Sequence, residues 1–207
     1  MAKVYFYYGS MNSCKTSQLI QTAYNYQEQG LKALILKPTT DTRDGDSCHV
    51  KSRITEPFPA IPFDPEKTSN NELRKIIAEH RPKVILVDEV QFFGPRIKFL
   101  VKECDLRNIA LLCYGLRNSF NGKSFPASEY LLVHADKLCE MKTMCFCGKK
   151  ATHNLLVQNG VPVRDEGDGV LVGDVAGVTE DDGYHTVCRK HFYTGQWKLG
   201  MRKPKQQ

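Results

Sequence analysis

The sequence of 207 residues lacks three features that would assign it to whole classes of protein. No apolar run approaches the length that a membrane-spanning helix requires. The first residues carry neither the basic start nor the long apolar segment of a secretory signal. No stretch interleaves basic and aromatic residues in the way that a nucleic-acid-binding face does. We therefore expect a cytoplasmic protein that binds neither membranes nor nucleic acid.

The charge balance and the cysteines are compatible with this expectation. The formal net charge is +6, but part of the excess lies near the C-terminus, where we interpret the basic residues as a solvated tail. The eight cysteines are not expected to form disulfides in a reducing compartment. Cys104 and Cys113 fall in apolar patterns and are predicted to be buried. The length allows one domain of ordinary size, alone or with a small appendage.

Residues 9–16, Gly-Ser-Met-Asn-Ser-Cys-Lys-Thr, have the spacing of a phosphate-binding loop, which is Gly, four residues, Gly, Lys and Ser or Thr. In such a loop backbone amides hold the phosphates, the lysine reaches the outer phosphates and the hydroxyl binds Mg²⁺. An apolar run precedes the stretch and a helical pattern follows it, as the motif requires. Cys14 replaces the second glycine. For the loop taken alone, an ordinary turn with a solvated lysine is therefore the alternative.

Acidic residues follow two of the predicted strands. The apolar run 83–87 ends in Asp88 and Glu89, and an acid at this place in a phosphate-loop protein helps to hold Mg²⁺. A core strand that simply ends in solvated acids is the alternative. Asp41 and Arg43 follow the apolar run 33–36, at the end of a strand where α/β proteins hold ligands, although both side chains could equally be solvated.

Strand and helix patterns alternate through the first two thirds of the chain. Apolar runs at 4–8, 33–36, 83–87 and 109–114 predict buried strands, and helices are expected after the phosphate loop, after the capping box at Ser69, over 96–107 and over 128–135. Four prolines between residues 56 and 65 are expected to exclude regular structure there. The alternation predicts an α/β fold with a mostly parallel sheet and a site at the carboxyl ends of its strands.

Two further groups of residues carry chemistry. Phe120 and Phe125 lie in a polar loop after the strand 109–114, where they could sandwich a planar base or anchor the loop to the core. Cys-Phe-Cys at 145–147 and Cys-Arg-Lys-His at 188–191 bracket a segment rich in Gly, Asp and Val. These spacings predict a structural zinc site closing a loop-and-strand appendage, with four free side chains as the alternative.

Taken together, these motifs resemble the cellular-type (type II) thymidine kinases, and in particular their bacterial and phage branch. The resemblance covers residues 5–192. It rests on the loop at 8–13, Asp-Thr-Arg at 41–43, the strand end at 87–93, Tyr-Gly-Leu-Arg at 114–117 with the two phenylalanines, Ala-Asp-Lys-Leu at 135–138, and the Cys/His pairs.

The resemblance implies a P-loop NTPase-like α/β kinase domain over 1–141, a zinc-closed lasso domain over 142–193 that covers the nucleoside, and a basic tail over 194–207. It implies an ATP-dependent kinase that phosphorylates the 5′-hydroxyl of thymidine or deoxyuridine for DNA synthesis, with Mg²⁺ and a structural Zn²⁺. It also implies a homotetramer inhibited by thymidine triphosphate.

The resemblance also assigns roles to individual residues. Glu89 would be the general base, with Lys15 and Arg43 beside the triphosphate. The ATP and Mg²⁺ site would comprise Gly9, Ser10, Met11, Asn12, Ser13, Cys14, Lys15, Thr16, Asp41, Thr42, Arg43, Asp88, Glu89, Val90 and Gln91. The nucleoside site would comprise Met11, Phe92, Leu116, Phe120, Phe125, Gly169, Val170, Leu171, Val172, Gly173 and Tyr184. The zinc ligands would be Cys145, Cys147, Cys188 and His191.

Two departures from the family pattern keep other functions open. The link between Gly173 and Tyr184 is longer than usual, and Cys14 should distort the phosphate loop, since glycine is wanted where the backbone needs a positive φ. A nucleotide-binding protein with weakened catalysis is therefore the main alternative. A zinc-bearing nucleic-acid ATPase is a further one, which would require the basic, aromatic face that the sequence lacks.

Overall fold

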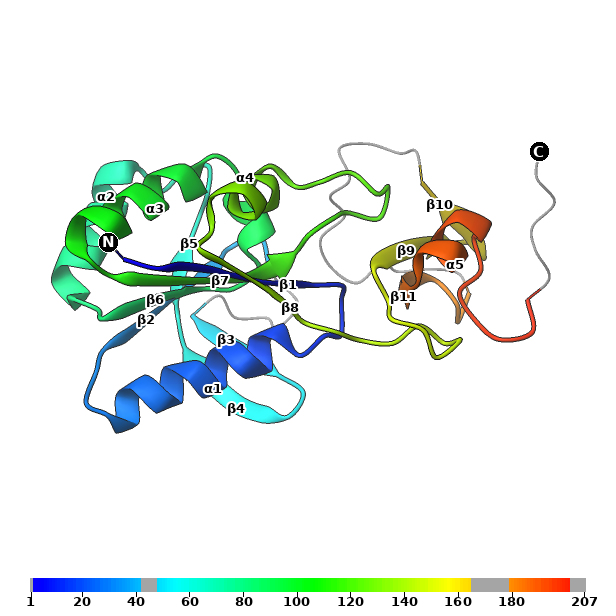
Figure 1. Ribbon diagram of the computed structural model, residues 1–207, viewed down its shortest axis with the longest axis horizontal. Coiled ribbons are helices and arrows are strands. Elements are labelled where there is room, and N and C mark those ends of the chain that lie inside the picture. Colours follow the sequence, from blue (N-terminus) through cyan, green and yellow to red (C-terminus); the bar gives the residue numbers. More distant parts are fainter. Residues whose placement is uncertain (1, 42–47, 165–178, 202–207) are drawn as a thin grey trace.

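A six-stranded sheet forms the centre of the computed structural model, which describes residues 2–41, 48–164 and 179–201 (Figure 1). The strand order is β5-β2-β6-β7-β1-β8, and every neighbouring pair is parallel. The strands are β1 Val4–Gly9, β2 Ala33–Pro38, β5 Ile61–Phe63, β6 Val84–Val87, β7 Ala110–Leu116 and β8 Lys137–Glu140. The prediction of an α/β fold with a parallel sheet is confirmed.

Helices cover both faces of this sheet (Figure 1). One face carries α2, α3 and α4, and the other carries α1 with the hairpin of β3 and β4. Their bounds are α1 Lys15–Glu28, α2 Asn70–His80, α3 Arg96–Arg107 and α4 Pro126–His134, with a short 3-10 helix η1 at Val90–Phe93. Successive residues of β6 face opposite sides of the sheet, so Ile85 packs into one core and Leu86 into the other. A strand buried on both sides therefore needs a continuous apolar run.

The helix ends follow local signals in the sequence. The capping box is present, since Ser69 Oγ accepts from the Glu72 N–H and the Glu72 carboxylate accepts from the Ser69 N–H. Helix α3 has the predicted bounds. Helix α4 begins earlier than residue 128, because Pro126 occupies its first turn, where proline is already set in a helical φ.

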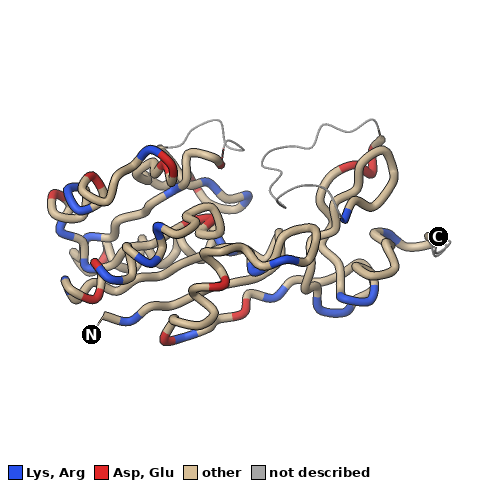
Figure 2. The backbone as a smooth tube through the Cα atoms, turned by 90° about the horizontal axis from the view of Figure 1, so that it is seen from above, with Lys and Arg blue, Asp and Glu red and all other residues tan. Residues whose placement is uncertain are grey.

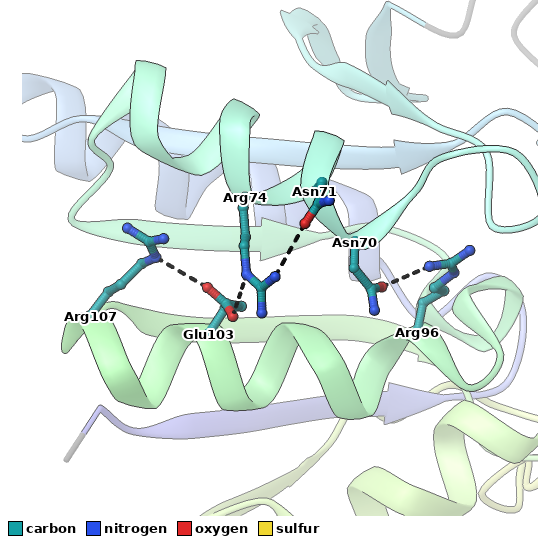
Figure 3. A network of polar contacts seen from close by, with 6 residues as sticks. All are labelled: Asn70, Asn71, Arg74, Arg96, Glu103 and Arg107. Atoms are coloured by element: carbon teal, nitrogen blue, oxygen red, sulfur yellow. Dashed lines mark hydrogen bonds and ion pairs between the residues drawn. The ribbon is translucent and has the colours of Figure 1, made fainter.

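A buried carboxylate ties α2 to α3 (Figure 3). Glu103 is 3% exposed; its Oε1 accepts from Arg74 Nε at 2.9 Å and its Oε2 from Arg107 Nε at 3.4 Å. Arg96 Nη1 donates to Asn70 Oδ1 at 2.7 Å further along the same pair of helices. Two guanidinium groups thus compensate one buried negative charge, as burial of a carboxylate requires.

The expectation that prolines exclude regular structure between residues 56 and 65 is wrong. This segment holds β4 Thr55–Pro59, which pairs with β3 His49–Ser52, and β5. Strand β5 lies at the edge of the six-stranded sheet, and β4 belongs to a two-stranded sheet. Proline is tolerated in such strands because the N–H that it lacks can face away from the partner strand.

The C-terminal part forms a separate small sheet at one end of the molecule, beyond the carboxyl ends of the central strands (Figures 1 and 2). Its order is β10-β9-β11, with β9 His153–Gln158, β10 Val161–Val163, β11 Gly183–Val187 and the short helix α5 Arg189–Thr194. A compact apolar cluster that includes Leu155, Val187 and Trp197 lies beneath it. Among the described residues no helix is both long and apolar enough to span a bilayer.

Candidate active site and metal centre

A cavity of about 710 Å³ opens where the carboxyl ends of the central strands meet the small sheet. The predicted site residues that line it are Met11, Asn12, Ser13, Cys14, Lys15, Thr16, Asp41, Asp88, Glu89, Gln91, Phe92, Leu116, Phe120, Phe125 and Tyr184. The predicted residues Gly9, Ser10 and Val90 lie next to these in the chain without lining the cavity. Thr42, Arg43, Gly169, Val170, Leu171, Val172 and Gly173 lie outside the described residues.

The phosphate loop is held by its own polar groups. Lys15 Nζ donates to Ser10 O at 2.8 Å and to Ser13 Oγ at 3.2 Å, and Ser13 Oγ donates to Ser10 O. A Cβ on Gly9 would lie 2.4 Å from Met141 O and 2.5 Å from Ser13 Oγ, so only glycine fits there. The loop therefore closes tightly on itself and directs Lys15 along the inside of the turn.

Cys14 adopts the backbone conformation for which the motif uses glycine. Its φ is 59° and its ψ 25°, in the left-handed region, and it is the N-cap residue of α1. A side chain in this region costs about 1–2 kcal/mol relative to glycine. The thiol is exposed and belongs to the cavity lining. The loop thus has its expected path, with backbone strain at one residue.

Oxygen ligands suited to Mg²⁺ converge at the end of β6. Thr16 Oγ1 lies 3.4 Å from both carboxylate oxygens of Asp88, which is 3% exposed. The Asp88 N–H donates to Leu36 O, which fixes the residue at the end of the parallel ladder. A hydroxyl beside a carboxylate is the donor set that Mg²⁺ takes from phosphate-loop proteins, so these two residues fit that ion.

Glu89 follows in a strained conformation. Its φ is 42° and its ψ 47°, and the residue is 7% exposed. Gln91 Nε2 donates to Glu89 Oε2, and Gln91 Oε1 accepts from the Leu116 N–H at 2.9 Å. A left-handed residue that is not glycine is held only where its surroundings over-determine it, and such residues gather at functional sites.

Aromatic side chains form the other end of the cavity. Phe120 is 2% and Phe125 7% exposed, and both belong to the lining. The Phe120 ring lies 6.4 Å from that of Tyr184 on β11, and the Phe92 ring lies 6.4 Å from that of Phe125. The two alternatives for these phenylalanines are thus compatible, since each ring is packed into the protein and also presents a surface to the cavity.

A cluster of three thiols and one imidazole lies beside the small sheet, formed by the turn before β9 and by α5 with its N-cap. The ligand atoms of Cys145, Cys147, Cys188 and His191 lie within 4.8 Å of one another. Cys145 Sγ and Cys188 Sγ are 3.3 and 3.5 Å from His191 Nδ1, and Cys147 Sγ is 3.9 Å from Cys188 Sγ. Tetrahedral zinc with bonds of about 2.3 Å to sulfur and about 2.0 Å to nitrogen requires separations of about 3.5–3.8 Å. The cluster therefore fits a zinc ion.

Several lining residues carry no motif in the sequence. Lys51, Ser52, Arg53 and Ile54 reach the cavity from the hairpin of β3 and β4, and Asn154 reaches it from β9. Arg53 and Ile54 form the turn of this hairpin, and the four consecutive residues 51–54 all line the cavity, so no alternation in the sequence distinguished them. For Asn154 we find no signal in the sequence.

Comparisons with known proteins agree with the motifs. The family model described as "Thymidine kinase" matches residues 2–192. A thymidine kinase of Zymomonas mobilis is 41% identical over 194 residues, covering 93% of this chain and 96% of that protein. Similar proteins with the same description from Rhodopirellula baltica and Escherichia coli O157:H7 are 43% and 40% identical over 196 residues, covering 93% of this chain and 88% and 91% of those proteins.

Proposed function

The chain belongs to the thymidine kinase family, and from this premise we propose that it transfers the γ-phosphate of ATP to the 5′-hydroxyl of thymidine. The observation that carries the proposal is a single cavity with the phosphate loop and Asp88 at one end, aromatic rings at the other, and Glu89 in its lining. The product would be thymidine 5′-monophosphate, made in the cytoplasm from salvaged nucleoside for DNA synthesis. Deoxyuridine is a second acceptor, because one methyl group discriminates weakly.

Phosphoryl transfer depends on positioning and on charge stabilisation, and these are the tasks we assign to the chain. Glu89 accepts the proton of the attacking 5′-hydroxyl, and the carboxylate is able to do so because it lines the cavity. Lys15, the loop amides of residues 9–16 and Arg43 stabilise the triphosphate charge. Thr16 and Asp88 would hold Mg²⁺, which would neutralise charge on the phosphates.

The nucleoside end is assigned in the same way. Met11, Phe92, Leu116, Phe120 and Phe125 form the walls of the base pocket, with Phe120 stacking on the thymine ring. Tyr184 covers the base from the lasso. The backbone of residues 169–173 reads the hydrogen-bonding edge of the base, as the family resemblance implies.

The remaining organisation is part of the same proposal. Residues 1–141 form the kinase domain, residues 142–193 the lasso domain, and residues 194–207 a basic tail. The Cys and His cluster holds a structural zinc that ties together the ends of the lasso and takes no part in catalysis. The chain assembles as a homotetramer, and thymidine triphosphate inhibits it by placing its base in the nucleoside pocket.

The alternative is a nucleotide-binding protein with weakened catalysis, and it rests on the side chain that Cys14 carries at a left-handed position of the phosphate loop. The presence of Glu89, Asp88 and Lys15 in one cavity argues against it, because a protein that only binds nucleotide has no need of a general base.

Transfer of labelled phosphate from ATP to thymidine tests the proposal. Zinc-replete protein should form thymidine monophosphate, and Glu89→Gln should reduce the rate about 100-fold or more, as expected for loss of a general base. Folded, zinc-replete protein that forms no product from thymidine or deoxyuridine but still binds ATP would support the second candidate.

A further inference from the structure

The amide of Gln91 connects two parts of the cavity that come from different strands. Its Nε2 donates to Glu89 Oε2 and its Oε1 accepts from the Leu116 N–H at 2.9 Å. Glu89 follows β6, and Leu116 is the last residue of β7. Resting on the kinase proposal above, we propose that Gln91 is a positioning residue that fixes the carboxylate of the general base relative to the nucleoside-binding loop.

The chemistry of the two contacts leaves the amide one orientation. The backbone N–H of Leu116 can only donate, so it must meet the carbonyl oxygen of Gln91. The amide nitrogen then faces Glu89, where it donates to a carboxylate, which when ionised accepts only. A primary amide is the neutral side chain that can satisfy both partners at once. Gln91 is 3% exposed, so water cannot readily replace either contact.

The absence of a side chain at Gly115 makes room for these two hydrogen bonds of Gln91. A Cβ on Gly115 would lie 2.5 Å from Gln91 Oε1, 2.8 Å from Val90 Cγ1 and 3.1 Å from the Val90 N. No left-handed φ requires glycine at this position. Gly115 therefore serves the close approach of η1 to β7, and the approach is what brings Gln91 to the Leu116 N–H.

The two hydrogen bonds of Gln91 act on Glu89 and Leu116, which other contacts also hold in place. Ser128 Oγ donates to Leu116 O at 2.5 Å, so both backbone groups of Leu116 are held by side chains. Glu89 is left-handed, and the Phe92 N–H donates to Glu89 O within the turn. Leu116 begins the loop that carries Phe120 and Phe125, which are the proposed base walls. Gln91 thereby sets the distance between the base pocket and the carboxylate that receives the 5′-hydroxyl proton.

The test compares thymidine kinase kinetics of the full chain, four single variants and one double variant. Gln91→Met keeps the length of the side chain and removes both hydrogen bonds, and Gly115→Ala should displace the amide without removing it. Gln196→Met is the matched control, since Gln196 also accepts one hydrogen bond, from Thr194 Oγ1, and donates one, to Met201 O, within the C-terminal segment. The fourth variant, Glu89→Gln, is also combined with Gln91→Met.

Gln91→Met should lower kcat about 10- to 100-fold, the effect of losing one hydrogen bond to a charged group, with KM for ATP within about threefold of wild type. Gly115→Ala should shift kcat in the same direction, and Gln196→Met should leave it unchanged. In the Glu89→Gln background the Gln91→Met change should have almost no further effect, because Gln91 acts through Glu89. An equal fall of kcat in both backgrounds, or an unchanged kcat, would overturn the proposal.

Amide hydrogen exchange tests the role of Gln91 independently of the proposed kinase activity. If the wild-type chain phosphorylates no nucleoside, the kinase function fails, and the Leu116 N–H still reports on the bridge. This amide should be protected from exchange in wild type and in Gln196→Met, and lose protection in Gln91→Met and Gly115→Ala. Equal protection in wild type and Gln91→Met would show that the bridge does not hold the loop and would overturn the inference.

Discussion

Asn154 Oδ1 accepts a hydrogen bond of 2.8 Å from the backbone N–H of Met11. The bond joins β9 of the small sheet to the phosphate loop across most of the chain. Asn154 is 1% exposed, and Met11 lines the cavity. The small sheet thus supports the phosphate-loop end of the cavity directly, besides carrying Tyr184 at its aromatic end.

Asn154→Ala should therefore weaken ATP binding. Loss of one hydrogen bond, with the Met11 N–H left without its partner, corresponds to about 1 kcal/mol, or about a fivefold rise in the Kd for ATP. Titration calorimetry with a non-hydrolysable ATP analogue measures this. Asn71→Ala, which removes an exposed contact to Arg74, is the control and should bind ATP as wild type does. An unchanged Kd in Asn154→Ala would show that the loop keeps its shape without the bond.

Cys14→Gly should bind ATP more tightly than the natural chain, because glycine removes the exposed side chain that lines the cavity at the phosphate loop. We expect about a threefold to tenfold lower Kd for ATP, with thymidine affinity nearly unchanged. Cys14→Ala keeps the Cβ and removes only the sulfur, so it should resemble wild type if the Cβ alone crowds the nucleotide. Equal ATP affinity of the natural chain and Cys14→Gly would show that the loop accommodates the side chain.

One zinc ion should bind per chain, and Cys188→Ser should abolish its binding. Because the small sheet has a small apolar core, loss of the ion should lower the thermal unfolding temperature and expose the segment 142–201 to proteolysis. Metal analysis by mass spectrometry and a thermal melt in a strong chelator measure both effects. Cys48→Ser, at an exposed cysteine outside the cluster, should keep the full zinc content.

Glu103→Ala should destabilise the fold without changing the catalytic parameters of the folded protein. The change leaves Arg74 and Arg107 without their carboxylate, and since both guanidinium groups are partly exposed we expect a loss of about 1–3 kcal/mol in the free energy of unfolding. Urea unfolding measures this loss. Glu79→Ala, which breaks the exposed pair with Lys75, should have little effect on stability.

Acid should destabilise the protein in part through His153. Burial, and then the charges of Arg117 and Arg189, lower the pKa of His153 to about 4. Its unfolded pKa is about 6.5, so the unfolded chain binds the proton first, and the contribution of the neutral ring, present above pH 6.5, is lost as the pH falls toward 4.

His153→Gln should accordingly lose less stability than wild type between pH 7 and 5, by about 1–2 kcal/mol. Urea unfolding at both pH values gives the difference, and zinc content is checked in each sample. Parallel loss of stability in the two proteins would show that His153 does not titrate in this range.

Much of the fold followed from local patterns in the sequence. The strands β1, β2, β6 and β7 are apolar runs that pack into the cores on both faces of the sheet. Helix α2 begins at the predicted capping box, and α3 has the predicted bounds. The burial of Cys104 and Cys113 was also predicted, and burial raises the pKa of the Cys104 thiol to about 12.

Other elements had no local signal. Strand β8 consists of Lys137–Glu140, with Leu138 half-exposed, so it shows neither an apolar run nor alternation, and it forms because the edge of β1 offers it hydrogen bonds. The prolines of β4 and β5 led to the prediction that this segment contains no strand. Strands form there because proline is permitted at sheet edges.

The sequence by itself determined which functional groups this protein carries, because each group consists of residues close together in the chain: the phosphate loop, the acids after β6, and the Cys and His pairs. The tertiary structure decided how these groups meet. Asn154 reaches Met11, and Gln91 bridges Glu89 and Leu116, only because packing of the two sheets and of η1 against Gly115 brings distant segments together. Such contacts depend on register and close packing of whole elements, which no local spacing of residues encodes.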